Sequence, residues 1–127
     1  MKPAVLLLAA GAFAIVTGAA AAAPRLKPIM RDWKAQANQA QLMLNGAVPY
    51  DEAQLRQILT GMVSDARDVE AGISGASAGA LAVKDRFSQF EADASATLQT
   101  AAARDSARAR FQRVAGDCRS CHDALRN

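Results

Sequence analysis

The sequence predicts an all-α protein folded as an antiparallel four-helix bundle. Apolar residues recur at spacings of three and four in four successive stretches, which is the period of an amphipathic helix. The stretches are joined by short segments rich in Gly, Pro and Asn, and short loops favour antiparallel neighbours. Aromatic residues make up only 5% of the 127-residue chain, and the abundant alanine suits closely packed helices. No stretch alternates apolar and polar residues as a half-buried strand would.

The N-terminal segment has the pattern of a secretory signal peptide. Lys2 gives a positively charged start, residues 3–16 are nearly all apolar, and small residues of the A-x-A kind follow at 17–23. We therefore expect residues 1–23 to direct export to the periplasm, with an uncleaved membrane anchor as the alternative. Residues 24–127 then form a single domain.

Charge and motif content exclude several classes of function. The formal net charge of +3 is too mild to indicate nucleic-acid binding. The sequence pattern shows no internal repeat, no phosphate-binding loop and no paired-carboxylate constellation for acid–base chemistry. Enzymatic turnover is not expected.

Two helices are predicted in the first half of the domain. The first begins near Lys27, because Pro28 is tolerated only in a first turn, and it stops at Asn45-Gly46. Its apolar stripe is Leu26, Ile29, Met30, Trp33, Ala37, Ala40 and Leu44. The second begins at Asp51, a natural N-cap with Gln54 three residues later. Its stripe is Leu55, Ile58, Leu59, Met62, Ala66 and Val69.

Two further helices follow a flexible glycine- and serine-rich connection at residues 72–79. The stripe of the third is Val83, Phe87, Phe90, Ala94, Leu98 and Ala101. The fourth begins at Asp105 or Ser106, both of which are good cap residues. Its stripe is Ala107, Phe111, Val114, Cys118, Cys121, His122 and Leu125. The apolar stripe of this last helix therefore continues into a group of cysteine and histidine residues.

That group, Cys118-Arg119-Ser120-Cys121-His122, is the C-x-x-C-H signature for attachment of a c-type haem. On a helix, residues at offsets 0, +3 and +4 share one face. Both thiols and the imidazole can therefore meet one porphyrin, with the thiols bonded to its vinyl groups and His122 bound to the iron. We predict one covalent haem c, held by the C-terminal helix of the bundle.

Three alternatives compete for the same residues. A structural zinc site needs four Cys or His ligands, and the chain has only two Cys and one His. A thioredoxin-like C-x-x-C opens a helix after a strand, and no strand pattern precedes Cys118. The third alternative, a secreted helical bundle with one disulfide and no cofactor, would be colourless when purified.

The chain resembles the cytochrome c′ family, including its low-spin cytochrome c-556 relatives. The resemblance rests on the C-terminal run 116–123, on Arg126 four residues after His122, and on the segment 45–51, which is similar to the connection between the family's first two helices. Counting back from Pro49 without a gap puts Met30 at the family's distal position.

This resemblance implies a four-helix bundle with one haem near the C-terminus, and often a homodimer. It implies that Arg126 covers the proximal side of the haem or reaches a propionate, the alternative being a plain cation in the last turn. The family arginine that meets the propionates corresponds to Leu26, so Arg25 or Lys27 beside it is the candidate for that contact. In low-spin members the distal residue is a methionine ligand, and in high-spin members it does not bind the iron.

Two functions are therefore expected. His122 is the only histidine, so a second histidine ligand from the same chain is excluded. With Met30 as the distal ligand, the protein transfers single electrons in the periplasm, because thioether ligation raises the reduction potential. With an open distal side, it binds small gases such as nitric oxide or carbon monoxide. Met43 and Met62 are interpreted as core residues, and the arginines of the last helix either steer an acidic redox partner or form a solvated face.

Overall fold

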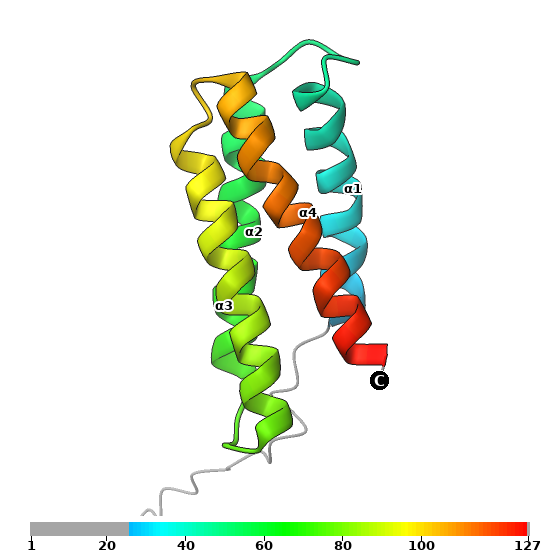
Figure 1. Cartoon of the computed structure of the whole chain (residues 1–127), viewed down its shortest axis with the longest axis vertical. Helices are drawn as coiled ribbons and strands as arrows, with labels where there is room; N and C mark the ends of the chain where they lie inside the picture. Colours follow the sequence, from blue (N-terminus) through cyan, green and yellow to red (C-terminus); the bar gives the residue numbers. More distant parts are fainter. Residues whose placement is uncertain (1–25, 127) are drawn as a thin grey trace, which may run out of the picture.

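The computed structural model describes the backbone of residues 26–126 and the side chains of residues 26–123. Four α-helices follow one another without a strand in this part of the chain: α1 (Leu26–Leu44), α2 (Glu52–Gly72), α3 (Ala78–Gln99) and α4 (Arg104–Arg126). Consecutive helices run in alternating directions, consistent with the predicted four-helix bundle (Figure 1). The expected signal peptide and Arg25 lie outside the described residues. None of the described helices is long and apolar enough to cross a membrane.

The helix ends follow local chemistry that the sequence had indicated. Asp51 caps α2, where its Oδ1 accepts a hydrogen bond from the backbone N–H of Gln54 at 3.1 Å. Ser77, in the stretch expected to be a flexible connection, caps α3 in the same way. Gly46, with a φ of 78°, forms the turn after α1, a backbone conformation that glycine adopts without strain.

Two boundaries differ from the predicted ones. The connection between α2 and α3 is only residues 73–77, because α3 already begins at Ala78 and includes Gly79. The last helix begins at Arg104, so Asp105 is not its cap but an acidic residue in the first turn. There its negative charge still interacts favourably with the positive end of the helix dipole.

The core lies along the inward stripes of all four helices. Each stripe predicted from the 3-4 spacing contributes buried side chains. The buried apolar residues are Trp33, Ala40, Met43, Leu44, Leu55, Ile58, Leu59, Met62, Val63, Ala66, Val69, Phe87, Phe90, Ala94, Ala101, Ala107, Phe111 and Val114. Met43 and Met62 are fully enclosed in this core, as expected of methionines that fill gaps between helices.

Contacts between loops tie the chain together at one end of the bundle. The hydroxyl of Tyr50, in the connection between α1 and α2, donates a hydrogen bond to the carbonyl oxygen of Ala101, in the connection between α3 and α4. Arg56 on α2 donates to the carbonyl oxygen of Leu98 near the end of α3. These contacts hold together the end at which α1 finishes and α4 begins.

The first helix packs less extensively than the other three. Pairs α2–α3 and α3–α4 are in contact over much of their length, whereas α1 touches α2 and α4 over smaller regions. The space between α1 and α4 is therefore filled only in part by their side chains. This is where the candidate site lies.

Truncation of a core side chain tests the packing. Leu59 is fully buried in α2, so Leu59→Ala is expected to lower the free energy of unfolding by about 2–5 kcal/mol, through lost burial and the cavity left behind. Urea unfolding measures this loss. Leu81→Ala, at a position that is 49% exposed on α3, is the control and should change the same free energy by less than about 0.5 kcal/mol. Equal effects of the two substitutions would contradict the core described here.

Candidate functional site

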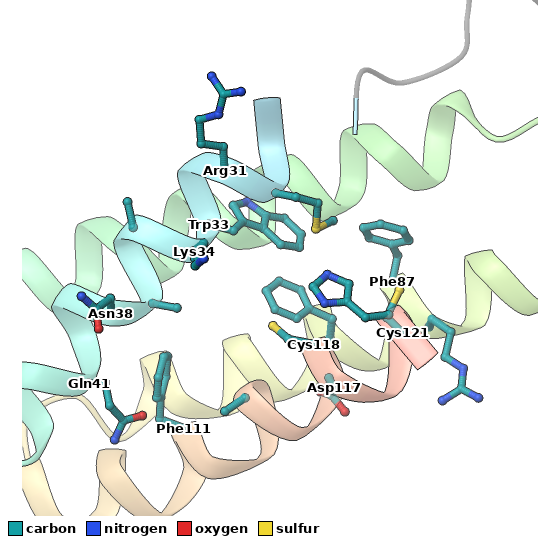
Figure 2. Close-up of a pocket in the computed structure, with 17 residues that line it drawn as sticks. Arg31, Trp33, Lys34, Asn38, Gln41, Phe87, Phe111, Asp117, Cys118 and Cys121 are labelled. Atoms are coloured by element: carbon teal, nitrogen blue, oxygen red, sulfur yellow. The ribbon is translucent and has the colours of Figure 1, made fainter. Parts of the chain in front are cut away.

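A cavity of about 980 Å³ lies between α1, α3 and α4. Met30 lines it from α1, and Cys118, Cys121 and His122 line it from α4. Figure 2 shows Cys118 and Cys121 reaching the space from the α4 side, opposite Trp33 on α1. Four residues singled out in the sequence therefore line one cavity, although Met30 and His122 are more than ninety positions apart in the chain.

The register of α4 explains how its side chains reach the cavity. Phe111 and Val114 are buried in the core, at 2% and 1% exposure. Cys118 and Cys121 continue the same face by one and two further turns. Core packing of the first half of α4 thus sets the rotation of the helix, and this rotation turns the cysteine-bearing face toward the cavity.

The two cysteines are free thiols and do not have the properties of a reactive redox pair. Burial raises the pKa of the Cys118 thiol, and the negative charge of Asp117 raises it further. Burial also raises the pKa of Cys121, against a smaller opposing effect of Arg86. Reactive C-x-x-C cysteines instead have lowered pKa values. No group of three or more Cys, His, Asp or Glu side chains among the described residues could hold a metal ion.

Aromatic side chains form one wall of the cavity. The Trp33 ring stacks on Phe90 of α3 with ring centroids 4.3 Å apart and planes 10° from parallel. Phe87 meets the same tryptophan at 6.1 Å and a tilt of 58°. The indole N–H of Trp33 donates a hydrogen bond to Oδ2 of Asp65 on α2 at 2.9 Å. This bond fixes the indole by its polar edge and leaves its apolar surface to the aromatic cluster and the cavity.

The sequence pattern predicts Trp33, Phe87 and Phe90 only as members of helix stripes and does not indicate this wall. A helix stripe does not tell whether a given aromatic residue contacts another helix or faces a cavity. The one signal in the sequence was the presence of aromatic residues on two helices, and their pairing required the three-dimensional arrangement.

Positive charges border the cavity at positions that the sequence pattern does not indicate. Arg31 and Lys34 line it from α1, and Arg86 lines it from α3. Arg86 also donates a hydrogen bond to the hydroxyl of Ser120, inside the C-x-x-C-H motif, at 2.7 Å. Lys27 is exposed in the first turn of α1 and is not among the described residues that line the cavity. Arg25 and the side chain of Arg126 lie outside the described residues.

Two carboxyl groups meet beside the motif. Asp93 on α3 is buried, and Asp117 on α4 lines the cavity next to Cys118. Burial, a hydrogen bond to Asp93 and the negative charge of Asp93 raise the pKa of Asp117 to about 7. Burial also acts to raise the pKa of Asp93, but hydrogen bonds from Asp117 and Gln89 outweigh it, so the pKa of Asp93 is lowered. One proton is therefore shared unequally, with Asp117 as its main carrier.

The residues present fit a covalently bound haem. The cavity volume is at the upper end of the range of about 300–1,000 Å³ typical of cofactor and ligand sites. Its lining is mostly apolar and aromatic, as a porphyrin face requires. Two thiols for attachment and an imidazole for the iron lie on one side, a thioether lies on another, and cations stand at the border.

Comparison with known proteins adds no further constraint. The chain matches no protein-family model, no curated protein and no solved structure. The interpretation of the site therefore rests on its own residues, namely the C-x-x-C-H motif, Met30 and the aromatic wall around a common cavity.

The carboxyl pair predicts an unusual dependence of stability on pH. Folding raises the pKa of Asp117 from 3.8 to about 7, so between these values the folded state holds a proton that the unfolded state does not. The free energy of unfolding should therefore fall as pH rises through this window. Asp117→Asn should remove this fall and, near pH 8, raise the free energy of unfolding by on the order of 1 kcal/mol. Urea unfolding at several pH values measures both effects.

Asp85→Asn provides the control, because Asp85 is exposed on the same helix as Asp93. It should retain the fall in stability seen in the unmodified protein. A stability that rises with pH between about 4 and 7 in the unmodified protein would contradict the raised pKa of Asp117.

Proposed function

We propose that the protein is an exported monohaem cytochrome of the cytochrome c′ type, and that it transfers single electrons in the periplasm. One observation carries the proposal. Met30 and the residues of the C-x-x-C-H motif line the same cavity, although they belong to the first and last helices. A thioether and an imidazole on a common cavity with two attachment thiols are the parts that a haem with two protein ligands needs.

Each residue then has a defined role. Cys118 and Cys121 attach the porphyrin covalently, and His122 provides the proximal iron ligand. Met30 provides the distal ligand, and the apolar wall around Trp33 excludes water from the porphyrin face. When bound, the haem supplies a reversible one-electron couple at its iron. Thioether ligation and an apolar environment both favour the reduced form and so raise the reduction potential.

Positively charged residues around the cavity are candidates to bind the propionate groups of the haem. Arg31, Lys34 and Arg86 line the cavity and are exposed enough to meet carboxylates at its edge. They are better candidates for this contact than Lys27, which does not line the cavity. Arg126 remains a candidate for the proximal side or a propionate on the strength of the family resemblance.

The exposed arginines on α4 support the proposal that the redox partner has an acidic surface. Oδ1 of Asp105 lies 3.7 Å from Nε of Arg104 and 3.5 Å from Nη2 of Arg108. Arg110, Arg113 and Arg119 are exposed farther along the helix, toward the motif. A positive surface next to the haem edge would speed encounter with a small acidic electron carrier, and the effect would weaken at high salt.

Gas binding is the second candidate function, and the packing of α1 is the observation that favours it. Met30 is half-buried on the helix that packs least extensively against the others. A distal ligand on such a helix can yield its position at lower cost than one held in the core. Nitric oxide or carbon monoxide would then bind at the open side of the haem.

The proposed function predicts that haem is attached covalently to the chain. Protein expressed with export and haem-attachment machinery should be coloured, and the haem should stay with the chain after denaturation. Cys118→Ala and Cys121→Ala should each weaken this attachment, and the double variant should abolish it, because no other cysteine is present. Denaturing electrophoresis stained for haem provides the measurement. A colourless exported protein would refute the proposal and support the disulfide-only alternative.

The distal ligand is tested by Met30→Leu, which keeps the side-chain volume and removes the thioether. If Met30 is the distal ligand, as the electron-transfer proposal requires, the unmodified protein should show low-spin absorption bands that do not respond to carbon monoxide. These bands should give way to high-spin, gas-sensitive bands in the variant, with a lower reduction potential. Met43→Leu, a fully buried methionine on the same helix, is the control and should leave the bands unchanged. High-spin, gas-responsive bands in the unmodified protein would instead favour gas binding.

A further inference from the structure

Two carboxyl groups next to the motif have no part in attaching a haem or binding its iron. Asp93 on α3 is only 9% exposed. Asp117 on α4 lines the cavity beside Cys118, and its Oδ2 is buried without a hydrogen-bond partner among the described residues. A buried carboxylate oxygen without a donor is costly, so its presence next to a second carboxyl group calls for an explanation.

A shared proton explains the arrangement. Two carboxylates in contact within a poorly solvated site do not both ionise easily, and one proton between them turns repulsion into a hydrogen bond. The side-chain amide of Gln89 donates to Oδ2 of Asp93 at 3.0 Å. This donor stabilises Asp93 as the ionised member and leaves Asp117 to carry the proton.

The surrounding charges keep this proton exchangeable. Arg113 on α4 acts on both carboxyl groups, Arg110 acts on Asp93, and Arg86 on α3 acts on Asp117. From α1, Arg31 and Lys34 line the same cavity. The three arginines on α3 and α4 favour the ionised pair and oppose the effect of burial.

The opposing effects of burial and of the nearby cations place the pKa of Asp117 near neutral pH. The pKa of Asp117 is raised only to about 7, so a modest change in nearby charge would alter its protonation. The pair is therefore neither permanently protonated nor permanently ionised at the pH of most aqueous compartments.

We propose that Asp93 and Asp117 form a proton-binding site linked to the oxidation state of the haem. The pair takes one proton from water as the iron accepts one electron from a redox partner. It returns that proton to water when the electron leaves. Only an O–H bond of the pair forms and breaks. The inference rests on the proposed haem attachment and goes beyond it, because electron transfer by itself requires no proton.

The link between the protonation of the carboxyl pair and the oxidation state of the haem is electrostatic. Cys118, the residue directly after Asp117, would be bonded to the porphyrin, so Asp117 would stand one residue from the point of attachment, on the same cavity. Reduction lowers the positive charge on the iron by one, and an ionised Asp117 then loses part of its stabilisation. We expect the proton affinity of the pair to rise roughly tenfold on reduction, which corresponds to about 59 mV in the potential of a one-electron couple.

The reduction potential of the haem-loaded protein, measured across pH, tests this coupling. In the unmodified protein the potential should fall with rising pH around neutrality, by about 59 mV in total. Asp117→Asn should make the potential independent of pH in this range. Asp93→Asn should move the dependent region to lower pH, because an amide at position 93 can donate to the Asp117 carboxylate. Asp85→Asn, which removes one exposed carboxylate from α3, is the matched control and should retain the fall.

Infrared difference spectra between the oxidised and reduced protein identify the group that binds the proton. A band of a protonated carboxyl group should grow on reduction in the unmodified protein and in Asp85→Asn, and be missing in Asp117→Asn. A potential that does not change with pH in a coloured, redox-active protein would overturn this inference alone. A pH dependence or carboxyl band that survives in Asp117→Asn would also overturn it. A colourless protein would overturn it together with the proposed function.

Discussion

The rotation of α4 about its own axis is the constraint on which the site depends. Phe111 and Val114 enter the core and are almost fully buried, which leaves little freedom in how the helix is turned. Because the same 3-4 spacing continues to Cys118 and Cys121, the core residues of α4 and both cysteines share one face. A shift of one residue in this register would turn both thiols away from the cavity.

The uneven packing of the four helices creates the space that this face looks into. The contacts of α3 with α2 and with α4 are extensive, whereas α1 is held over smaller regions. Near the cavity, Trp33 connects α1 to α3 by stacking on Phe90 and to α2 by its hydrogen bond to Asp65. These contacts position α1 without closing the gap to α4. Met30 lies one helical turn before Trp33, so the same contacts bring it to the cavity.

Electrostatics around the cavity separate into two regions with different physical roles. Arg31, Lys34 and Arg86 are solvent-exposed cations, suited to exposed carboxylates and sensitive to salt. Asp93 is buried and Asp117 is half-buried at the cavity, where partial burial and the neighbouring carboxylate retain a proton on Asp117 to a higher pH. An apolar cavity next to such a pair strengthens every interaction with charge inside it. The chemistry that the site supports thus depends on burial as much as on residue type.

The sequence by itself determined the four helices, most of their ends and the C-x-x-C-H motif. These features depend on neighbours in the chain: the 3-4 stripe, the Asp51 cap and the spacing of Cys118, Cys121 and His122 are all local. The two boundaries that differ, at Ala78 and Arg104, also have local settings: Ser77 caps α3, and α4 begins one residue before the expected cap at an exposed position. Met30 could be proposed only through a resemblance, because helix periodicity alone does not distinguish it from Met43.

Only the tertiary structure decided which of these methionines lines the cavity and which is enclosed in the core. It also decided the aromatic wall, the cations around the cavity and the meeting of Asp93 with Asp117. Each of these joins residues on different helices, and their distances depend on how the helices pack. A one-dimensional pattern contains no information on which side of a helix remains uncovered, because that is set by the neighbouring helices.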